Sequence, residues 1–265
     1  MGILNLSPDS FSRDGIKVKR AGDLSAVVDR AQQLVREGSD ILDIGGESTR
    51  PGAKAVPVKE EIRRIIPAIR LLAQKIKIPI SVDTYKPDVA REALDAGAVI
   101  VNNIMGTKKD PRLLKMIARY DAAAVLMHIK GEPRTVQKKI VYRDLIGEII
   151  VSLRKSIENC LAFGIKSDRI IIDPGIGFGK TVENNLEIID RLKDFGILNQ
   201  PLLVGTSRKS FIGKILGKEV HERLAGSVVT ACISAVNGAH IIRVHDVRET
   251  KEALTLVDAI TRSGT

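Results

Sequence analysis

The chain has no tryptophan, two cysteines and few aromatic side chains, which make up 3% of its 265 residues. Without Trp, a hydrophobic core must be built mainly from Ile, Leu, Val and Ala. Cys160 and Cys232 are far apart and both fall in segments with a helical pattern. We therefore expect buried packing residues in a reducing, cytoplasmic compartment, and neither a disulfide nor a metal pair. No apolar run approaches the ~20 residues of a membrane span, and the start shows no signal-peptide pattern, so no membrane partner is predicted.

The sequence also lacks the features of a linker: it has no Ser/Gly tract, no Pro-rich stretch and no charge block. This predicts a single domain over residues 1–265. The formal net charge is +10, but Lys and Arg are mixed with acidic residues, as in Lys59-Glu-Glu-Ile-Arg-Arg64. No basic stripe carries interleaved aromatics. The pattern favours a solvated basic surface with a pocket for a small anion over a nucleic-acid partner.

Apolar, β-branched segments alternate with amphipathic segments along the whole chain. Strands are predicted at 2–6, 40–44, 78–82, 98–101, 123–127, 169–172, 201–204 and 240–244. Helices are predicted at 24–36, 60–75, 88–96, 113–118, 145–161, 186–192, 223–236 and 249–260. This alternation is typical of βαβ units and a parallel sheet. About eight units in a chain of this length favour a closed (β/α)₈ TIM barrel over a doubly wound open sheet.

Polar residues follow nearly every predicted strand. They are Asn5, Asp43, Asp83 with Thr84, Asn102 with Asn103, His128, Asp173, the segment Gly205-Thr-Ser-Arg-Lys-Ser210, and Arg243 with His245. A barrel places its active site at the carboxyl ends of its strands. Unpaired buried polar groups are costly, so a core has no use for such a ring, and the ring predicts an active site. Singly, some members have simpler interpretations: Asp83 as a helix cap, Lys209 as a solvated helix start, and His128 as a structural histidine, which we favour for that residue.

The segment Asp173-Pro-Gly-Ile-Gly-Phe-Gly-Lys180 lies between a predicted strand and a predicted helix. Its three glycines, at alternate positions, let the backbone turn sharply and approach a ligand closely. An aspartate at the end of a strand would point into the space that such a loop encloses. The simpler interpretation is a solvated turn with a helix cap, and the repetition of the arrangement along the chain weighs against it.

The predicted ring divides by charge into two sets. Acceptors and amides are Asp83, Asn102 and Asp173, and cationic donors are Lys209, Arg243 and His245. The first set suits a flat heterocycle with amino and ring N–H groups, such as guanine or a pterin, because a carboxylate accepts paired N–H bonds. The second set suits a phosphate or a pyrophosphate. Together they indicate a nitrogen heterocycle that carries a phosphate group.

Six segments of the chain resemble motifs of the dihydropteroate synthases. They are Met1-Gly-Ile-Leu-Asn-Leu-Ser-Pro-Asp-Ser-Phe-Ser12, Asp43-Ile-Gly-Gly-Glu-Ser-Thr-Arg-Pro-Gly52, Ile80-Ser-Val-Asp-Thr84, Asp173-Pro-Gly-Ile-Gly-Phe-Gly-Lys180, Gly205-Thr-Ser-Arg-Lys-Ser-Phe-Ile-Gly213 and Ile242-Arg-Val-His-Asp-Val247. The likeness runs almost from end to end. It implies a (β/α)₈ barrel that joins 6-hydroxymethyl-7,8-dihydropterin pyrophosphate to p-aminobenzoate, giving 7,8-dihydropteroate and pyrophosphate in folate biosynthesis. It further implies Mg²⁺ as a cofactor and a homodimer, which is common in that family.

The resemblance also assigns roles, position by position. The implied pterin site is Asp83, Asn102, Asp173 and Lys209. The implied p-aminobenzoate site, where sulfonamides would compete, is Thr49, Arg50, Pro51, Phe178, Lys209 and Ser210. The implied pyrophosphate site is Asn5, Arg243 and His245, with Asn5 also at the metal. The implied catalytic residues are Asp14, Lys209, Arg243 and His245.

The chain departs from the family pattern in its first loop, where Phe11-Ser-Arg-Asp-Gly15 replaces the usual Phe-Ser-Asp-Gly-Gly. We expect Asp14 to take the role of the displaced aspartate and Arg13 to point outward. Asn103 also stands where an aspartate is common. Two further functions stay open: a pterin-dependent methyltransferase acting on a corrinoid protein, and a non-catalytic pterin-binding relative. The motifs that include Glu47 and Arg208 argue against the methyltransferase.

Overall fold

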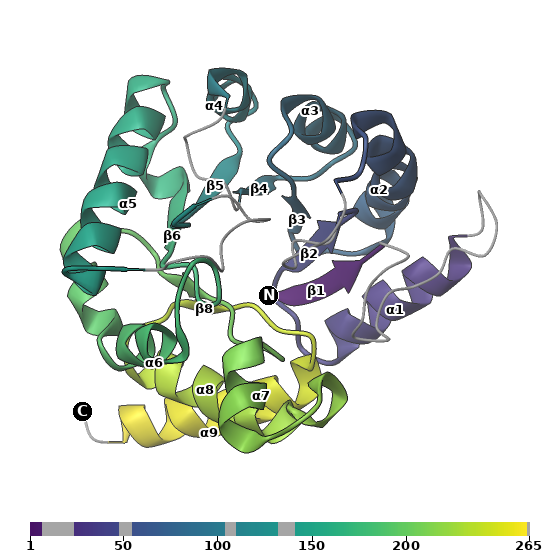
Figure 1. Cartoon of the computed structure of the whole chain (residues 1–265). Helices are drawn as coiled ribbons and strands as arrows, with labels where there is room; N and C mark the ends of the chain where they lie inside the picture. Colours follow the sequence, from purple (N-terminus) through teal and green to yellow (C-terminus); the bar gives the residue numbers. More distant parts are fainter. Residues whose placement is uncertain (7–23, 48–54, 104–109, 132–140, 264–265) are drawn as a thin grey trace.

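The computed structural model describes residues 1–6, 24–47, 55–103, 110–131 and 141–263. In these ranges, eight short strands follow one another around a central ring, with helices outside it (Figure 1). The strands are β1 (Gly2–Asn5), β2 (Leu42–Gly45), β3 (Ile80–Asp83), β4 (Ile100–Asn103), β5 (Ala123–Met127), β6 (Ile170–Asp173), β7 (Leu203–Val204) and β8 (Ile241–Ile242). The helices are α1 (Ser25–Arg36), α2 (Val58–Lys75), α3 (Pro87–Asp95), α4 (Pro111–Arg119), α5 (Leu145–Ala162), α6 (Val182–Asp190), α7 (Ser210–Leu216), α8 (Leu224–Val236) and α9 (Val247–Arg262).

The ring of strands is parallel and closed. Strands β1 to β6 form one sheet in chain order, and β7 pairs with β8 in a second. Single parallel bridges join the two sheets at both edges, from Ile172 to Leu202 and from Gly2 to Val244. Neighbours in the ring are neighbours in sequence, whereas a doubly wound sheet reverses its strand order. The predicted (β/α)₈ barrel is therefore confirmed, and the open-sheet alternative is excluded.

The core is aliphatic, as the composition predicts. Its main cluster consists almost entirely of Ile, Leu, Val and Ala from the strands and the inward faces of the helices, with Phe195 the largest fully buried side chain. Cys160 on α5 is fully buried, and burial raises its pKa to about 12. Cys232 on α8 is half-buried, so the expectation that both cysteines are buried was wrong for this one. Within the described ranges, no helix is both long and apolar enough to cross a membrane.

Strand register brings polar side chains to one level at the carboxyl ends. Asn5 pairs with Gly45, Gly45 with Asp83, and Asp83 with Asn102. Gly45 has no side chain and so leaves an opening in this row. A Cβ atom built there would lie 3.5 Å from Asn5 Oδ1 and 3.5 Å from Asp83 Cβ, so these two side chains border the opening. The side chains of Asn5 and Asp83 thus approach each other across a position without a side chain.

Candidate active site

The residues that the sequence places at strand ends lie at one end of the barrel. Asn5, Asp83 and Asp173 are the last residues of β1, β3 and β6. Asn102 and Asn103 end β4, and both are buried. His128 follows β5 directly, Arg243 and His245 follow β8, and Lys209 precedes α7. Because parallel strands share direction, these side chains gather at the end where the active site of such a barrel is found.

Arg243 connects three strands through a part-buried ion-pair network. Its Nε donates to Asp43 Oδ2 at 2.6 Å, and its Nη2 donates to Asp83 Oδ2 at 2.8 Å. Asn102 Nδ2 donates to the same Asp43 oxygen at 3.2 Å. Asp83 was open to a simpler role as a helix cap, but Lys86 occupies the cap position of α3 and Asp83 instead binds Arg243. Asp43 belongs to the predicted ring of strand-end polar residues, but no ligand or contact was predicted for it. It alternates with Gly45 along β2, and that alternation is the signal that it shares the inward face.

Burial changes the acid–base properties of Asp83. Desolvation raises its pKa to about 7, against the opposing effect of the Arg243 guanidinium. Asp43 is fully buried. Among the described residues, three buried oxygens have no hydrogen-bond partner: Oδ1 of Asp43, Oδ1 of Asp83 and Oγ of Ser81. Buried polar atoms are usually satisfied, so acceptors held this way are suited to a ligand that brings N–H donors.

A second cluster surrounds Asp173. Its Oδ1 accepts a hydrogen bond from Gly175 N at 2.7 Å, and burial raises its pKa, while the Lys209 ammonium acts against that rise. Lys209 Nζ donates to the Ile176 carbonyl and lies 4.4 Å from the centre of the Phe178 ring. Burial lowers the pKa of Lys209 to about 8. Lys209 is the residue before α7, but its ammonium turns inward, so the alternative of a solvated helix start does not apply.

The glycine loop after β6 approaches its neighbours closely. Gly175 has φ +74°, and a Cβ atom there would lie 1.9 Å from the carbonyl oxygen of His128. Gly177 has φ +80°, and a Cβ atom there would lie 2.8 Å from Lys209 Cδ. Side chains are thus excluded at both positions by contact and by conformation. The sharp turns expected of the glycines are present, and the close approaches seen here are to His128 and Lys209 of the chain itself.

Lys180, at the end of this loop, received no role from the sequence. It is buried, and its Nζ lies 3.0 Å from His128 Nδ1 and donates to the Phe178 carbonyl at 3.0 Å. Burial lowers its pKa to about 7. These contacts fix the loop onto the end of β5 and fit the structural role favoured for His128. The position of Lys180 at the end of the glycine motif is the sequence feature that could have indicated this structural role.

The turn between β7 and α7 holds His245 in place. Ser207 Oγ lies 3.0 Å from His245 Nδ1 and accepts from the His245 amide at 3.2 Å. The next residue, Arg208, has φ +58° and forms two hydrogen bonds to the Asp246 carboxylate, at 3.0 and 2.5 Å. Such a conformation persists in a non-glycine residue where its surroundings over-determine it. Ser210 opens α7 and is exposed.

The acidic and cationic residues that the sequence analysis separated into two sets are not separated in space. Arg243 lies between Asp43 and Asp83, and Lys209 interacts electrostatically with Asp173, so cations and carboxylates alternate across the site. The physical reason is that buried charges need partners of opposite sign. Asp14, Thr49, Arg50 and Pro51 lie outside the described residues.

A cavity of about 520 Å³ lies at the opposite, amino-terminal end of the strands. It is lined by Met1, Ile242 and Lys251 among others, and it contains none of the strand-end polar ring. Since the ionisable groups converge at the carboxyl ends, the ring there is the candidate active site.

Known proteins match this chain over nearly its whole length. Residues 1–245 match the family described as pterin binding enzyme. The chain is 45% identical to a dihydropteroate synthase of Synechocystis, over 99% of this chain and 90% of that protein. It is 44% identical to that of Escherichia coli, over 98% of this chain and 90% of the relative.

Solved structures agree with the sequence relatives. A Yersinia pestis dihydropteroate synthase with a sulfonamide drug has a TM-score of 0.93 at 42% identity, covering 99% of this chain and 94% of the other. A Xanthomonas albilineans dihydropteroate synthase with 4-aminobenzoic acid has a TM-score of 0.90 at 40% identity, covering 98% and 92%. By family match, identity and fold, this chain belongs to the dihydropteroate synthases among the pterin-binding enzymes.

Proposed function

We propose that this chain condenses 6-hydroxymethyl-7,8-dihydropterin pyrophosphate with p-aminobenzoate, giving 7,8-dihydropteroate and pyrophosphate in folate synthesis. The observation that carries the proposal is the set of buried, unpartnered acceptor oxygens on Asp43 and Asp83, in a barrel of this family. A pterin brings amino and ring N–H donors that would satisfy such oxygens. We assign the pterin to Asp83, Asn102 and Asp173, with Lys209 beside the ring.

The amine site is assigned to the wall formed by Phe178, Lys209 and Ser210. Phe178 packs on Met127 and Ile129, and Lys209 lies against its ring. The bound 4-aminobenzoic acid and sulfonamide of the two solved relatives support an aromatic amine here, and sulfonamides are the inhibitors we expect. Thr49, Arg50 and Pro51 complete the proposed site from outside the described residues.

The leaving pyrophosphate is assigned to Arg243, His245 and Asn5. Among the described residues, Arg243 Nη1 makes no hydrogen bond, so one donor edge of its guanidinium is available to an anion. The described ranges hold no cluster of three or more His, Cys, Asp or Glu that could bind a metal. Magnesium often takes one or two protein oxygens and completes its shell with water and substrate phosphates, so the Asn5 amide oxygen fits such a role. When bound there, Mg²⁺ would neutralise charge on the departing pyrophosphate.

Charge dictates how these residues act. As the C–O bond to pyrophosphate breaks, the pterin becomes electron-poor and the leaving group gains negative charge. Asp83 and Asp173 stabilise the first, and Arg243 and His245 stabilise the second where it develops. The amino group of p-aminobenzoate then attacks the pterin methylene carbon as a neutral nucleophile. No protein nucleophile is needed, and neither cysteine takes part. The two free cysteines favour a cytoplasmic, reducing location for this reaction.

A pyrophosphate-release assay tests the proposed function. We expect release that requires both the pterin pyrophosphate and p-aminobenzoate. A non-catalytic relative would bind the pterin without releasing pyrophosphate. A corrinoid methyltransferase would instead transfer a methyl group from a methylated pterin to a corrinoid acceptor. Either result would replace the proposal with that alternative.

A further inference from the structure

Asp43 contacts both an amide and a cation of the strand-end ring. It is part of β2 and is 0% exposed. Its Oδ2 accepts hydrogen bonds from Arg243 Nε at 2.6 Å and from Asn102 Nδ2 at 3.2 Å. Its Oδ1 is buried without a partner among the described residues. A well-packed hydrophobic side chain is often at least as stabilising as a buried ion pair, so stability alone does not explain Asp43.

The bond to Asp43 fixes the orientation of the Asn102 side-chain amide. Such an amide has a donor end, Nδ2, and an acceptor end, Oδ1. Because Asp43 holds Nδ2, the acceptor end is the one that remains for a ligand. The reversed amide would place Oδ1 against the Asp43 carboxylate, where two acceptors repel each other. Asn102 is also buried, so water does not readily compensate for the lost bond.

With this orientation, Asn102 resembles the carboxylate beside it. Asp83 is the register partner of Asn102 on the neighbouring strand. Its Oδ2 is bound by Arg243 Nη2, and its Oδ1 is buried without a partner among the described residues. An ionised carboxylate only accepts hydrogen bonds, so Asp83 and Asn102 present acceptors side by side. Such a pair suits a heterocycle edge that carries N–H donors and repels an edge that presents ring lone pairs.

We propose that Asp43 sets the hydrogen-bonding orientation of Asn102 and so makes the site selective for a heterocycle edge with N–H donors. This inference rests on the proposed function, in which Asp83 and Asn102 bind the pterin. Asp43 is a positioning residue in this role, because its Oδ2 acts through the Asn102 amide. Its second contact is separate: without Asp43, Arg243 would still be bound to Asp83 at 2.8 Å.

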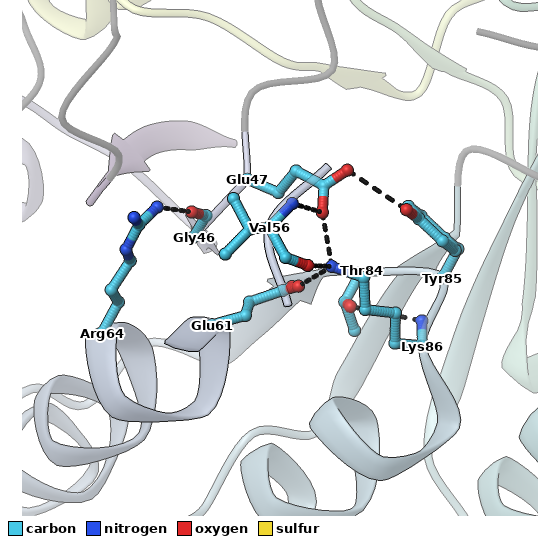
Figure 2. Close-up of polar contacts among 8 residues, drawn as sticks. All are labelled: Gly46, Glu47, Val56, Glu61, Arg64, Thr84, Tyr85 and Lys86. Carbon is cyan, nitrogen blue, oxygen red and sulfur yellow. Dashed lines mark hydrogen bonds and ion pairs between the residues drawn. The ribbon is translucent and has the colours of Figure 1, made fainter. Parts of the chain in front are cut away.

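A second buried carboxylate offers a matched control. Glu61, on the first turn of α2, is 1% exposed, and its Oε2 accepts from Lys86 Nζ at 2.5 Å (Figure 2). Lys86 also binds the Glu47 carboxylate and donates to the Val56 carbonyl at 2.7 Å, so it ties α2 to the start of α3. Removing Glu61 leaves Lys86 with Glu47, as removing Asp43 leaves Arg243 with Asp83. Glu61 therefore reports what the loss of a buried carboxylate does by itself.

The test is a double-mutant cycle on pterin binding, carried out with the full chain. Asp43→Leu keeps the branched shape of the side chain and removes its oxygens, and Asn102→Ala removes the amide. The two are measured singly and together, beside Asp43→Asn and Glu61→Met. Circular dichroism checks folding, and Asp43→Ala, which leaves room for water, replaces Asp43→Leu if that variant does not fold. Calorimetric titration with a pterin at pH 8 keeps Asp83 ionised, since its pKa is about 7.

We expect Asp43→Leu and Asn102→Ala each to weaken pterin binding about tenfold, with the double variant close to Asn102→Ala, because residues that act through one another are not additive. Asp43→Asn should keep most of the affinity, since Arg243 and Asn102 both donate toward the position of Oδ2 and would hold an amide oxygen there. Glu61→Met should bind the pterin as the wild type does. In Asp43→Leu, Arg243 keeps Asp83 and loses a nearby anion, so affinity for inorganic pyrophosphate should not fall.

Three results overturn the inference. Additive losses in the cycle would mean that Asp43 contacts the pterin itself. Equal losses of pterin and pyrophosphate affinity in Asp43→Leu would mean general damage to the site. Failure of both Asp43→Leu and Asp43→Ala to fold would make Asp43 a structural residue. A wild type that binds the pterin and releases no pyrophosphate contradicts the proposed function alone, whereas one that binds no pterin contradicts both.

Discussion

At the scale of single residues, the carboxyl ends of the strands hold carboxylates where an apolar side chain would be more stabilising. Asp43, Asp83 and Asp173 are all buried. Burial raises the pKa of Asp83 and of Asp173, so the folded protein bears the cost of keeping them charged. Shifted ionisable groups gathered in one place are characteristic of functional sites.

Asp173→Asn should weaken pterin binding by roughly 1–3 kcal/mol, the scale of a hydrogen bond to a charged group, and should preserve the fold. The carboxylate is held by Gly175 N, so an amide of the same shape keeps the geometry and loses one charged acceptor. Asp168→Asn is a matched control, because Asp168 is exposed just before β6. Calorimetric titration with a pterin measures both variants. Equal affinity in Asp173→Asn and Asp168→Asn would remove Asp173 from the pterin site.

The raised pKa of Asp83 predicts that pterin affinity and folding stability depend on pH in opposite directions. Its pKa is about 7 in the folded protein, against an ordinary value of 3.8. A pterin donating N–H groups needs the ionised form, so affinity should weaken as pH falls below 7, by up to about tenfold per pH unit. A raised pKa has the reverse effect on folding: the contribution of Asp83 to stability is greatest below 3.8 and is lost as pH rises through 7.

Titrations from pH 5.5 to 8.5 test this prediction, with Asp83→Asn as the comparison. The variant should bind the pterin more weakly at pH 8 and should lose the dependence on pH near 7. If the wild type and the variant show the same profile, another group titrates.

Alanine variants of Asp14 and Arg13 test the role of the altered first loop. We predict that Asp14→Ala cuts kcat severely, because Asp14 replaces the family's loop aspartate one position later in the chain. Arg13→Ala should change kcat little, because loops absorb a one-residue shift more readily than strands do. Steady-state kinetics of both variants decide between the two residues. A silent Asp14→Ala with a damaging Arg13→Ala would show that Arg13 points inward and that the reaction centre is altered.

At the scale of elements, periodicity located the strands and most helices, and local chemistry determined their ends. Helix α6 begins at Val182, four residues before the predicted start at 186. Its start is set by a capping box between Thr181 and Asn184, which an apolar pattern does not register. Helix α7 was not predicted as a separate element, because its seven residues are too few for a periodic signal.

The strand-end positions of Asp83, Asn102 and Asp173 could be read from the sequence, because each directly follows an apolar run. The sequence does not reveal which of these side chains contact one another. Arg243 and Asp43 are separated by 200 residues and meet only because the barrel closes. The roles of Lys86 and Lys180 were missed for the same reason: their partners come from other elements.

The glycine loop yields a prediction at this scale. Gly175→Ala should destabilise the fold by about 1–3 kcal/mol or more and weaken pterin binding, because the new methyl meets a backbone oxygen that cannot move easily. Gly164→Ala is the matched control: Gly164 has φ +88°, but nothing lies within 4 Å of an added Cβ atom. It should show the conformational cost alone, about 1 kcal/mol. Urea unfolding measures both variants, and equal losses would mean that the contact with His128 is unimportant.

At the scale of the whole molecule, helix α8 has small residues on its inward face and exposed apolar residues on its outward face. Ser227, Ala231 and Ser234 face the barrel, while Val229, Ile233 and Val236 are exposed. The exposed three are spaced four and three residues apart, so they form one stripe. Leu256 and Ile260 on the adjacent helix α9 are also exposed. Exposed apolar side chains grouped in this way on neighbouring helices indicate contact with a partner.

If the homodimer expected from the family resemblance forms, we predict that it uses this surface of α8 and α9. In a two-fold interface each substitution occurs twice, so its effect on association is doubled. Ile233→Glu should therefore weaken the dimer by at least about 4 kcal/mol, from about 2 kcal/mol per buried hydrophobic side chain replaced by a charge. Val151→Glu, at an apolar position on α5 that is also exposed, should leave association unchanged. Analytical ultracentrifugation over a range of concentrations measures both. A wild type that is monomeric throughout, or an Ile233→Glu variant that dimerises as the wild type does, would assign the stripe to some other contact.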